Sequence, residues 1–372
     1  MKITSYFLTI LGVLFCFSPV HAEDPIKIGA VFSLSSWGAL GGTQELNGLL
    51  MARDEINAAG GISGRPVQLI VEDTQSDLKS TAAAFRKLID FNSVSAIVGP
   101  NWAEFTEVAV PIAESAKVPF VSPSGYKEGL FENKKFSFTL QVPHYISARP
   151  LAQAMAQRGY KSIAVLVTDN AYLEGIFDGF RRVLPESDAR ITSIERVSPS
   201  QSDFRSMIAK IKKSNADAVL ALLLEGGNLH NFLTQARQLK LSLPIYSANG
   251  IPYDDLISKD MAIAEGVVFF DYLVPGGPEF IQAYTKRFGA QPGFASARAY
   301  DALYLIKAAI EQCGVQPAQI RECLSTSKYA GRSGTISFDR NGVLQSKEAN
   351  TFLQQVKNAK AEPFSVTDAA KN

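Results

Sequence analysis

Short runs rich in β-branched residues alternate with longer stretches of helical period from Ile26 onward. This alternation is typical of parallel sheets that are covered by helices on both faces. The apolar positions between Leu46 and Ile56 recur at helical spacing, and Gly60-Gly61 ends that helix. The expected strands of the first half are 26–32, 67–72, 96–98 and 120–122, and further helices are expected at 81–91 and 106–116.

The same alternation is used a second time after residue 162. The expected strands are 163–168, 190–197, 218–223 and 245–247, and they are separated by amphipathic helices such as 204–213. Between the two halves, Pro143 interrupts any helix and extends the chain over 139–145. Without the first 22 residues, which resemble a signal peptide, about 350 residues remain, and this length is enough for two hydrophobic cores. The sequence therefore predicts two lobes.

The first 22 residues have the features of a cleaved signal peptide. Lys2 supplies the positive end, residues 7–17 form an apolar run, and Val20-His21-Ala22 places small residues before the expected cleavage site. A membrane anchor is the competing interpretation, but the apolar run is about half of the ~20 residues that span a bilayer. We expect an exported protein, located in the periplasm.

The charge balance favours neither nucleic acid nor an anionic membrane surface as a partner. The chain has 37 basic and 36 acidic residues. Cleavage of the signal peptide removes Lys2, so the mature chain has 36 of each and no formal net charge. After cleavage Cys313 and Cys323 remain, and a disulfide between them is expected in an oxidising compartment. Two buried thiols are the alternative. No metal site is expected, because His144 and His230 have no partner at ligand spacing.

An enzyme is the second class of function that the alternating pattern allows. No expected strand is followed by the glycine pattern of a dinucleotide site, a P-loop or a nucleophile elbow. Serine, histidine and aspartate are present without a local arrangement that indicates a triad. We therefore expect no catalysis and no cofactor.

Four stretches carry a resemblance that covers nearly the whole mature chain. They are IKIGAVFSLSSWGALGG, then ARDEINAAGGISGRPVQLIVEDTQSD, then AIVGP followed by VAVPIAESAKVPFVSPSG, and finally SARAYDALYLIKAAI. In this order and at this spacing the chain resembles the leucine/branched-chain amino-acid-binding family of periplasmic solute-binding proteins, also called type I, which serve ABC importers.

The resemblance implies an α/β fold of two doubly wound parallel-sheet lobes that are joined by three hinge crossings. By that pattern the N-terminal lobe takes residues 24–141 plus 275–342. The C-terminal lobe takes 142–274 plus 343–365. The periodicity of the sequence does not by itself show this interleaving.

The resemblance also implies the function. A small molecule, by default an amino acid or a related small carboxylate, would bind in the cleft between the lobes. The partners would be the permease subunits of an ABC importer in the inner membrane, and the protein itself would be a monomer. A binder of aromatic or aliphatic acids or amides stays open as an alternative, as does a sensor that passes its closed form to a membrane receptor.

Loops that follow strands of the first lobe are expected to contact the ligand, because open parallel sheets bind ligands beyond the carboxyl ends of their strands. The loop 33–42 is rich in Ser and Gly and contains Trp37. Trp102 and Ala103 precede a helix whose amides favour an anionic group. Ala103 stands where the family usually has a serine, so its backbone amide alone can serve. Trp102 could equally belong to the core.

The loop after the strand 120–122 is the other half of this expected cradle. Ser122, Ser124 and Gly125 are taken as ligand-binding, and Ser124 aligns with a contact residue of the family. Tyr126 stands where a threonine is common, and its phenol could line a larger pocket.

The second lobe is expected to supply the lid. Tyr172 matches an aromatic residue that packs on the ligand in the family. Asn249 stands where amino-acid binders often carry an acid for the ammonium group, and an amide is only a neutral partner. Glu225 could replace the missing charge or could cap a helix before Gly226-Gly227. Residues 294–298 are expected to line the hinge side, and Asp301 to be structural.

Overall fold

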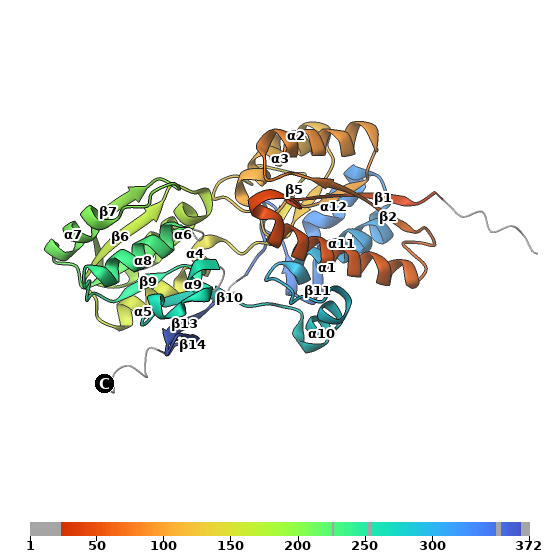
Figure 1. Ribbon diagram of the computed structural model, residues 1–372. Helices are drawn as coiled ribbons and strands as arrows, with labels where there is room; N and C mark the ends of the chain where they lie inside the picture. Colours follow the sequence, from red (N-terminus) through yellow and green to blue (C-terminus); the bar gives the residue numbers. More distant parts are fainter. Residues whose placement is uncertain (1–23, 225–226, 252–254, 347–350, 366–372) are drawn as a thin grey trace, which may run out of the picture.

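The protein is described here by a computed structural model, which covers residues 24–224, 227–251, 255–346 and 351–365. Figure 1 shows two lobes beside each other, each built around its own sheet. The expected signal peptide, 1–22, lies outside the described residues.

The first lobe contains a five-stranded sheet in which every neighbouring pair is parallel. Its central strands are almost wholly buried, which is typical of parallel sheets covered on both faces. The strand order is β2 (Val67–Asp73), β1 (Ile26–Phe32), β3 (Ala96–Val98), β4 (Phe120–Ser122) and β5 (Ser137–Thr139).

Helices from two distant parts of the chain cover this sheet. One hydrophobic core unites residues between 26 and 140 with residues between 280 and 338. Helices α1 and α11 approach closely in this core, and a Cβ on Gly48 would lie 2.0 Å from the Ser296 carbonyl oxygen. The helices on this side are α1 (Ala39–Ala58), α10 (Gly277–Phe288), α11 (Ser296–Cys313) and α12 (Pro317–Thr326). The other side is covered by α2 (Leu78–Arg86), its continuation η2 (Lys87–Phe91) and α3 (Ala103–Ala116).

The second lobe contains a seven-stranded sheet with cores on both faces. Five strands are parallel, and two C-terminal strands join one edge in antiparallel pairing. The order is β14 (Lys360–Pro363), β13 (Thr351–Lys357), β10 (Val268–Tyr272), β9 (Ile245–Ser247), β8 (Ala218–Leu222), β6 (Ser162–Thr168) and β7 (Arg190–Val197). The main helices are α4 (His144–Ser147), α5 (Arg149–Gln157), α6 (Ala171–Val183), α7 (Arg205–Lys213), α8 (Asn228–Gln238) and α9 (Asp255–Lys259).

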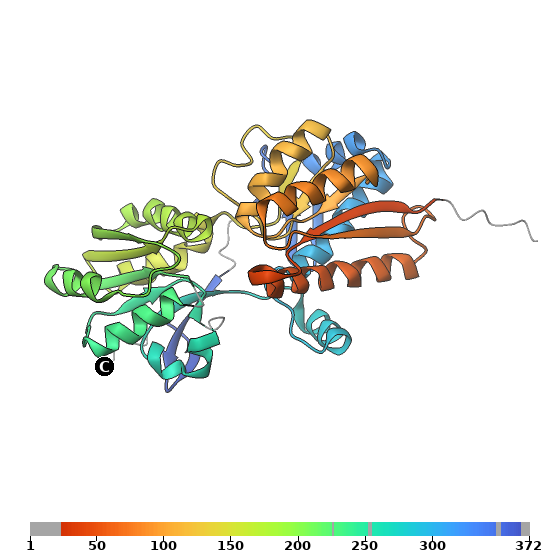
Figure 2. The same cartoon turned by 45° about the horizontal axis from the view of Figure 1, so that its top comes forward.

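The chain passes between the lobes three times. It crosses from β5 to α4 and from β10 to α10, and a third time between the first-lobe core, which includes Phe338, and β13. In Figure 2 the dark-blue strand ribbon of the C-terminus lies in one lobe and the lighter blue helices in the other. The predicted class, two α/β parallel-sheet lobes with three crossings, is confirmed. For the lobes we keep the boundaries 24–141 plus 275–342 and 142–274 plus 343–365 as a proposal.

The structure corrects one local prediction. Residues 33–42 were expected to form a loop, but a 3₁₀ turn spans Ser36–Gly38 and α1 begins at Ala39. A Cβ on Gly42 would lie 1.9 Å from the Ser33 carbonyl oxygen, so the glycine allows the helix to approach the end of β1. Close packing, and not a loop, explains the glycines here.

Several strands were not expected from the sequence. The short β5, the strand β10, the tail strands β13 and β14, and the hairpin of β11 (Lys328–Gly331) and β12 (Gly334–Ser337) belong to this group. In the described part of the chain, no helix is long and apolar enough to cross a membrane.

Candidate functional site

The amino end of α3 concentrates hydrogen-bond donors. Ala103 is the first residue of α3, and the amides of a first helical turn have no acceptor within their helix. Asn101 is fully buried; its Oδ1 accepts from the Ser33 amide at 3.0 Å. Within the described residues, Asn101 Nδ2 and Trp102 Nε1 are enclosed without an acceptor. These donors lie at the positive end of the helix dipole, where an anion is stabilised.

Trp37 lies over this helix end. Its ring centroid is 5.1 Å from that of Trp102 and 5.8 Å from that of Phe105. Trp37 is 60% exposed, so one face of this aromatic group remains open to solvent.

The loop after β4 is held in place by its own polar groups. The Ser122 hydroxyl donates to the Pro100 carbonyl at 2.6 Å and accepts from the Gly125 amide at 2.7 Å. A Cβ on Gly125 would lie 1.8 Å from Thr106 Oγ1, so this loop packs directly against α3. Ser122 and Gly125 thus use their predicted ligand-binding groups to shape the loop. The Ser124 hydroxyl instead donates to Glu45 Oε1 at 2.7 Å.

The Tyr126 side chain has different hydrogen-bonding partners from Ser124. Its hydroxyl donates to Glu128 at 2.7 Å, and its ring stacks on Phe131. It lines a hollow of about 220 Å³ together with Tyr145 and Arg182. Neither Ser124 nor Tyr172 lines that hollow, although the rings of Tyr126 and Tyr172 both contact the ring of His144.

The structure brings together Tyr172 and Asn249, two of the three predicted residues of the second lobe. Tyr172 lies in the first turn of α6, which the Asn170 side chain caps. The Tyr172 hydroxyl donates to Asn249 Oδ1 at 2.7 Å and lies 3.1 Å from the Tyr272 hydroxyl. Tyr272, at the end of β10, stacks on Phe294 with ring centroids 4.6 Å apart. Glu225 lies outside the described residues.

Two buried ionisable side chains belong to the same region: Glu45 is hydrogen-bonded to Ser124, and Arg298 interacts electrostatically with Tyr272. Burial raises the pKa of Glu45 to about 8, although the Ser124 hydrogen bond and Arg298 act in the opposite direction. Burial lowers the pKa of Arg298 to about 10, against the influence of Tyr272 and Glu45. Arg298 Nη1 donates to Gln141 Oε1 at 2.6 Å, at the first crossing. Arg298 lies in 294–298, the range expected to line the hinge side.

His144 lies between rings of both lobes at the start of α4. It meets Tyr126 and Tyr172 edge to face, with centroids 5.1 and 5.5 Å away. Burial lowers the pKa of His144 to about 4. A Cβ on Gly175 would lie 2.1 Å from His144 Nδ1, so α6 packs against this ring.

Side-chain contacts join α6 to the first lobe in this conformation. Asn170 Nδ2 donates to Glu104 Oε1 at 3.3 Å, and Arg182 lies 3.4 Å from Glu128. The first contact connects the amino ends of α6 and α3. The amino ends of α3 and α6, which carry Ala103 and Tyr172, therefore lie beside each other.

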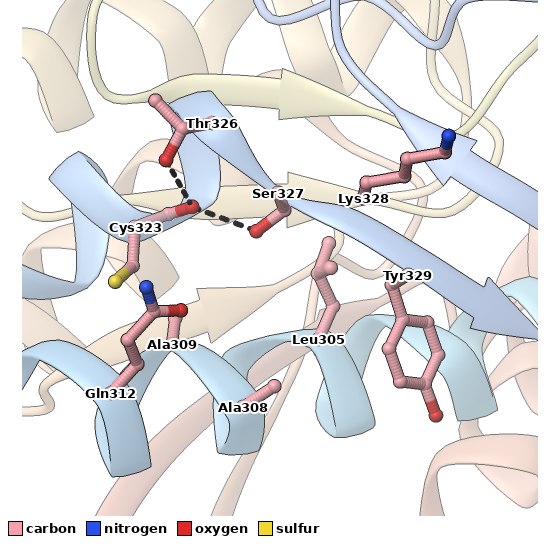
Figure 3. Close-up of a pocket in the computed structure, with 9 residues that line it drawn as sticks. All are labelled: Leu305, Ala308, Ala309, Gln312, Cys323, Thr326, Ser327, Lys328 and Tyr329. Atoms are coloured by element: carbon pink, nitrogen blue, oxygen red, sulfur yellow. Dashed lines mark hydrogen bonds between the residues drawn. The ribbon is translucent and has the colours of Figure 1, made fainter.

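A separate pocket lies in the first lobe between α11, α12 and β11. Its volume is about 130 Å³, and Figure 3 shows Leu305, Gln312 and Tyr329 among its lining residues. Cys323 also lines it and forms a disulfide with Cys313, with an S–S distance of 2.00 Å. None of the predicted ligand-binding residues lines this pocket. In the portion that the structure describes, no three His, Cys, Asp or Glu side chains are grouped to hold a metal ion.

Sequence reasoning missed Glu45, Gln141, Tyr272 and the packing role of His144. Glu45 follows Gly42 by three residues and precedes Leu49 by four, on the buried side of α1. A charged residue on a buried helix face is rare, and this pattern could have identified it. Tyr272 could not be identified in the same way, because β10 itself was not expected.

Two doubly wound lobes with polar loops at the carboxyl ends of their strands define a two-lobe solute-binding protein. The chain belongs to the periplasmic binding protein family, which matches residues 25–361. The resemblance to the leucine/branched-chain amino-acid-binding proteins is thereby confirmed.

Relatives of known description are similar over almost their whole length. The leucine-, isoleucine-, valine-, threonine- and alanine-binding protein of Pseudomonas aeruginosa is 25% identical over 345 residues, 89% of this chain and 90% of that protein. The branched-chain amino acid transporter substrate-binding protein of Streptococcus pneumoniae, solved with isoleucine, is 26% identical with a TM-score of 0.77, covering 91% of this chain and 98% of that one.

A solute-binding protein of an ABC transporter from R. palustris, solved with benzoate, shares the fold. Its TM-score is 0.74 at 17% identity, and it covers 91% of this chain and 95% of its own. The relatives named here are described as binding proteins and not as enzymes.

Proposed function

We propose that this chain is the periplasmic substrate-binding component of an ABC importer and binds an amino acid or a related small carboxylate between its lobes. The observation that carries the proposal is the amino end of α3, whose first-turn amides have no acceptor within their helix and which lies against the amino end of α6 of the other lobe through the Asn170–Glu104 hydrogen bond.

Residues from the opposite lobe complete the proposed site. Tyr172 and Asn249 are linked by a 2.7 Å hydrogen bond, and Asn170 on the same helix reaches Glu104 of α3. We propose that Tyr172 covers the ligand, while Ala103 and Ser124 contact it from the first lobe. Trp37 and Trp102 would form its aromatic wall, with Ser122, Gly125 and Tyr126 supporting the loop.

The remaining features of the proposal follow from the family. Residues 1–22 would direct the chain to the periplasm, where it would act as a monomer on permease subunits of the inner membrane, without cofactor or metal. Glu225 stays a candidate for the acid that Asn249 does not provide. A sensor that passes its closed form to a membrane receptor would use the same lobes.

A thermal-shift screen of the wild-type protein tests the proposal. The ligands are leucine, isoleucine, glutamate, benzoate and 4-methylpentanoate, each at increasing concentration. A ligand at 100 times its dissociation constant adds about 2.7 kcal/mol to stability, which raises the melting temperature by about 5 °C. The Tyr172→Ala variant should lose most of this shift, whereas Arg205→Met, which alters an exposed arginine, should keep it. If no acid stabilises the wild-type protein, the proposal is wrong.

A further inference from the structure

Arg298 is a buried cation without a carboxylate partner in the described part of the molecule. It is 4% exposed, and its Nη1 donates to Gln141 at 2.6 Å. Its guanidinium carbon also lies 5.5 Å from the ring centroid of Phe294. No other hydrogen bond or ion pair involves Arg298 among the described residues. Since a guanidinium has five N–H donors, most of its hydrogen-bonding capacity is unused.

The acid that interacts electrostatically with Arg298 does not neutralise it at neutral pH. Glu45 interacts electrostatically with Arg298, but it is buried and its pKa is raised to about 8, so it is mostly protonated at pH 7. Arg298 itself keeps its proton at that pH, because its pKa falls only to about 10. The pair therefore leaves one uncompensated positive charge in a buried position, which costs several kcal/mol unless an anion is added.

The surroundings of Arg298 belong to the candidate site. Glu45 accepts from Ser124 of the β4 loop at 2.7 Å. Tyr272, which interacts electrostatically with Arg298, lies 3.1 Å from the hydroxyl of Tyr172 in the other lobe. Arg298 thus lies at the hinge, between groups of both lobes. The described polar atoms that are enclosed without a partner do not include its nitrogens, so its unused donors reach solvent-accessible space.

We propose that Arg298 binds the carboxylate of the solute at the hinge side of the site, and that the site selects carboxylic acids without an ammonium group over the corresponding amino acids. This inference rests on the proposed function and specifies its ligand class. A guanidinium forms paired, charge-assisted hydrogen bonds with a carboxylate, so the unused donors of Arg298 match that group.

The selectivity follows from the charges around the site. A monoanionic acid neutralises the charge of Arg298. An amino acid also brings an ammonium group, and in the described part of the site Asn249, at the position matched to the family's acid, offers it only a neutral amide held by Tyr172. A buried ammonium without a paired carboxylate is unfavourable by several kcal/mol.

The test compares leucine with 4-methylpentanoate, which has the same side chain and carboxylate but no ammonium group. Isothermal titration at pH 7 should show that the wild-type protein binds 4-methylpentanoate at least tenfold more tightly than leucine. Arg298→Met should weaken 4-methylpentanoate binding at least about 30-fold, as expected when one partner of a buried charge pair is removed. Arg298→Lys, which keeps the charge but loses the fork of donors, should give an intermediate affinity. Arg205→Met is the matched control with wild-type affinity.

The outcomes separate this inference from the proposed function. Tighter binding of leucine by the wild-type protein would refute the selectivity and leave the solute-binding function intact. Equal affinity of wild type and Arg298→Met for 4-methylpentanoate would refute the role of Arg298. If Arg298→Met does not fold, as judged by circular dichroism, unchanged affinity of Arg298→Lys refutes the same role. If leucine, 4-methylpentanoate and benzoate all fail to bind the wild-type protein, both proposals fail.

Discussion

Replacing Glu45 with glutamine should change how the stability of the first lobe depends on pH. The Ser124 hydroxyl donates to Glu45 Oε1, and the amide oxygen of glutamine can accept the same hydrogen bond. The substitution therefore removes the ionisation and keeps the main contact.

The expected magnitude follows from the pKa of Glu45, which burial raises from 4.5 to about 8. Below pH 4.5 the carboxyl is protonated in both the folded and the unfolded chain and makes no difference. Between pH 4.5 and 8 the unfolded chain loses the proton and the folded chain keeps it, so the free energy of unfolding falls by about 1.4 kcal/mol per pH unit. The loss reaches about 3 kcal/mol at pH 7 and about 5 kcal/mol above pH 8, as an upper limit.

The ionisation of His144 changes the free energy of unfolding with pH in the opposite direction over part of this range. Burial lowers its pKa from 6.5 to about 4, so the unfolded chain binds the proton more tightly. Its contribution to stability is complete above pH 6.5 and is lost as the pH falls towards 4. The two effects oppose each other between pH 4.5 and 6.5 in the wild-type protein, and only the difference between wild type and Glu45→Gln isolates Glu45.

Urea unfolding at pH 5, 6, 7 and 8 measures this difference. The protein has two tryptophans, Trp37 and Trp102, and both lie in the first lobe, so tryptophan fluorescence follows the lobe that contains Glu45. The stability advantage of Glu45→Gln should increase steadily from pH 5 to 8. Glu132→Gln, which changes an exposed carboxylate of the same lobe, is the control. A constant difference across this range would refute the account of Glu45 as a buried, protonated acid.

Three further predictions concern other parts of the molecule. Reduction of the Cys313–Cys323 disulfide, or its replacement by two serines, should lower the free energy of unfolding by about 3 kcal/mol in urea titrations, because it closes a short loop in the unfolded chain; an unchanged midpoint would contradict this. Gly175→Ala places a methyl group against the ring of His144 and should destabilise the protein by about 1–3 kcal/mol in thermal melts, while unaltered stability would show that α6 can move away. Asn249→Asp should raise the affinity for leucine relative to 4-methylpentanoate in isothermal titrations, because a carboxylate can pair with the ammonium group; an unchanged ratio would place Asn249 away from that group.

The alternation of strands and helices was sufficient to predict the two parallel sheets. The buried strands β1 and β6 carry continuous apolar runs at 28–32 and 163–167, which buried parallel strands need. The tail strands β13 and β14 could not be predicted locally, because their pairing with β10 depends on contacts between distant segments. The stretch 33–42 was misjudged for a related reason, since Gly38 and Gly42 allow a close contact with Ser33.

For the site, the sequence identified which residues belong to it more accurately than what each side chain contacts. Tyr172 and Asn249 lie 77 residues apart, and their hydrogen bond depends on the order of strands in the sheet. Ser122 and Ser124 have the same side chain, yet one hydroxyl holds the loop and the other reaches Glu45. Residue type alone does not distinguish these roles, because the partners come from other elements of the lobe.

Small-angle X-ray scattering of the wild-type protein, with and without the acid that gives the largest thermal shift, tests most directly whether the two lobes enclose a small carboxylate. We predict that saturating acid lowers the radius of gyration, and that Arg298→Met requires much more acid for the same change. A radius of gyration that stays constant at saturation would contradict enclosure of the ligand by the two lobes.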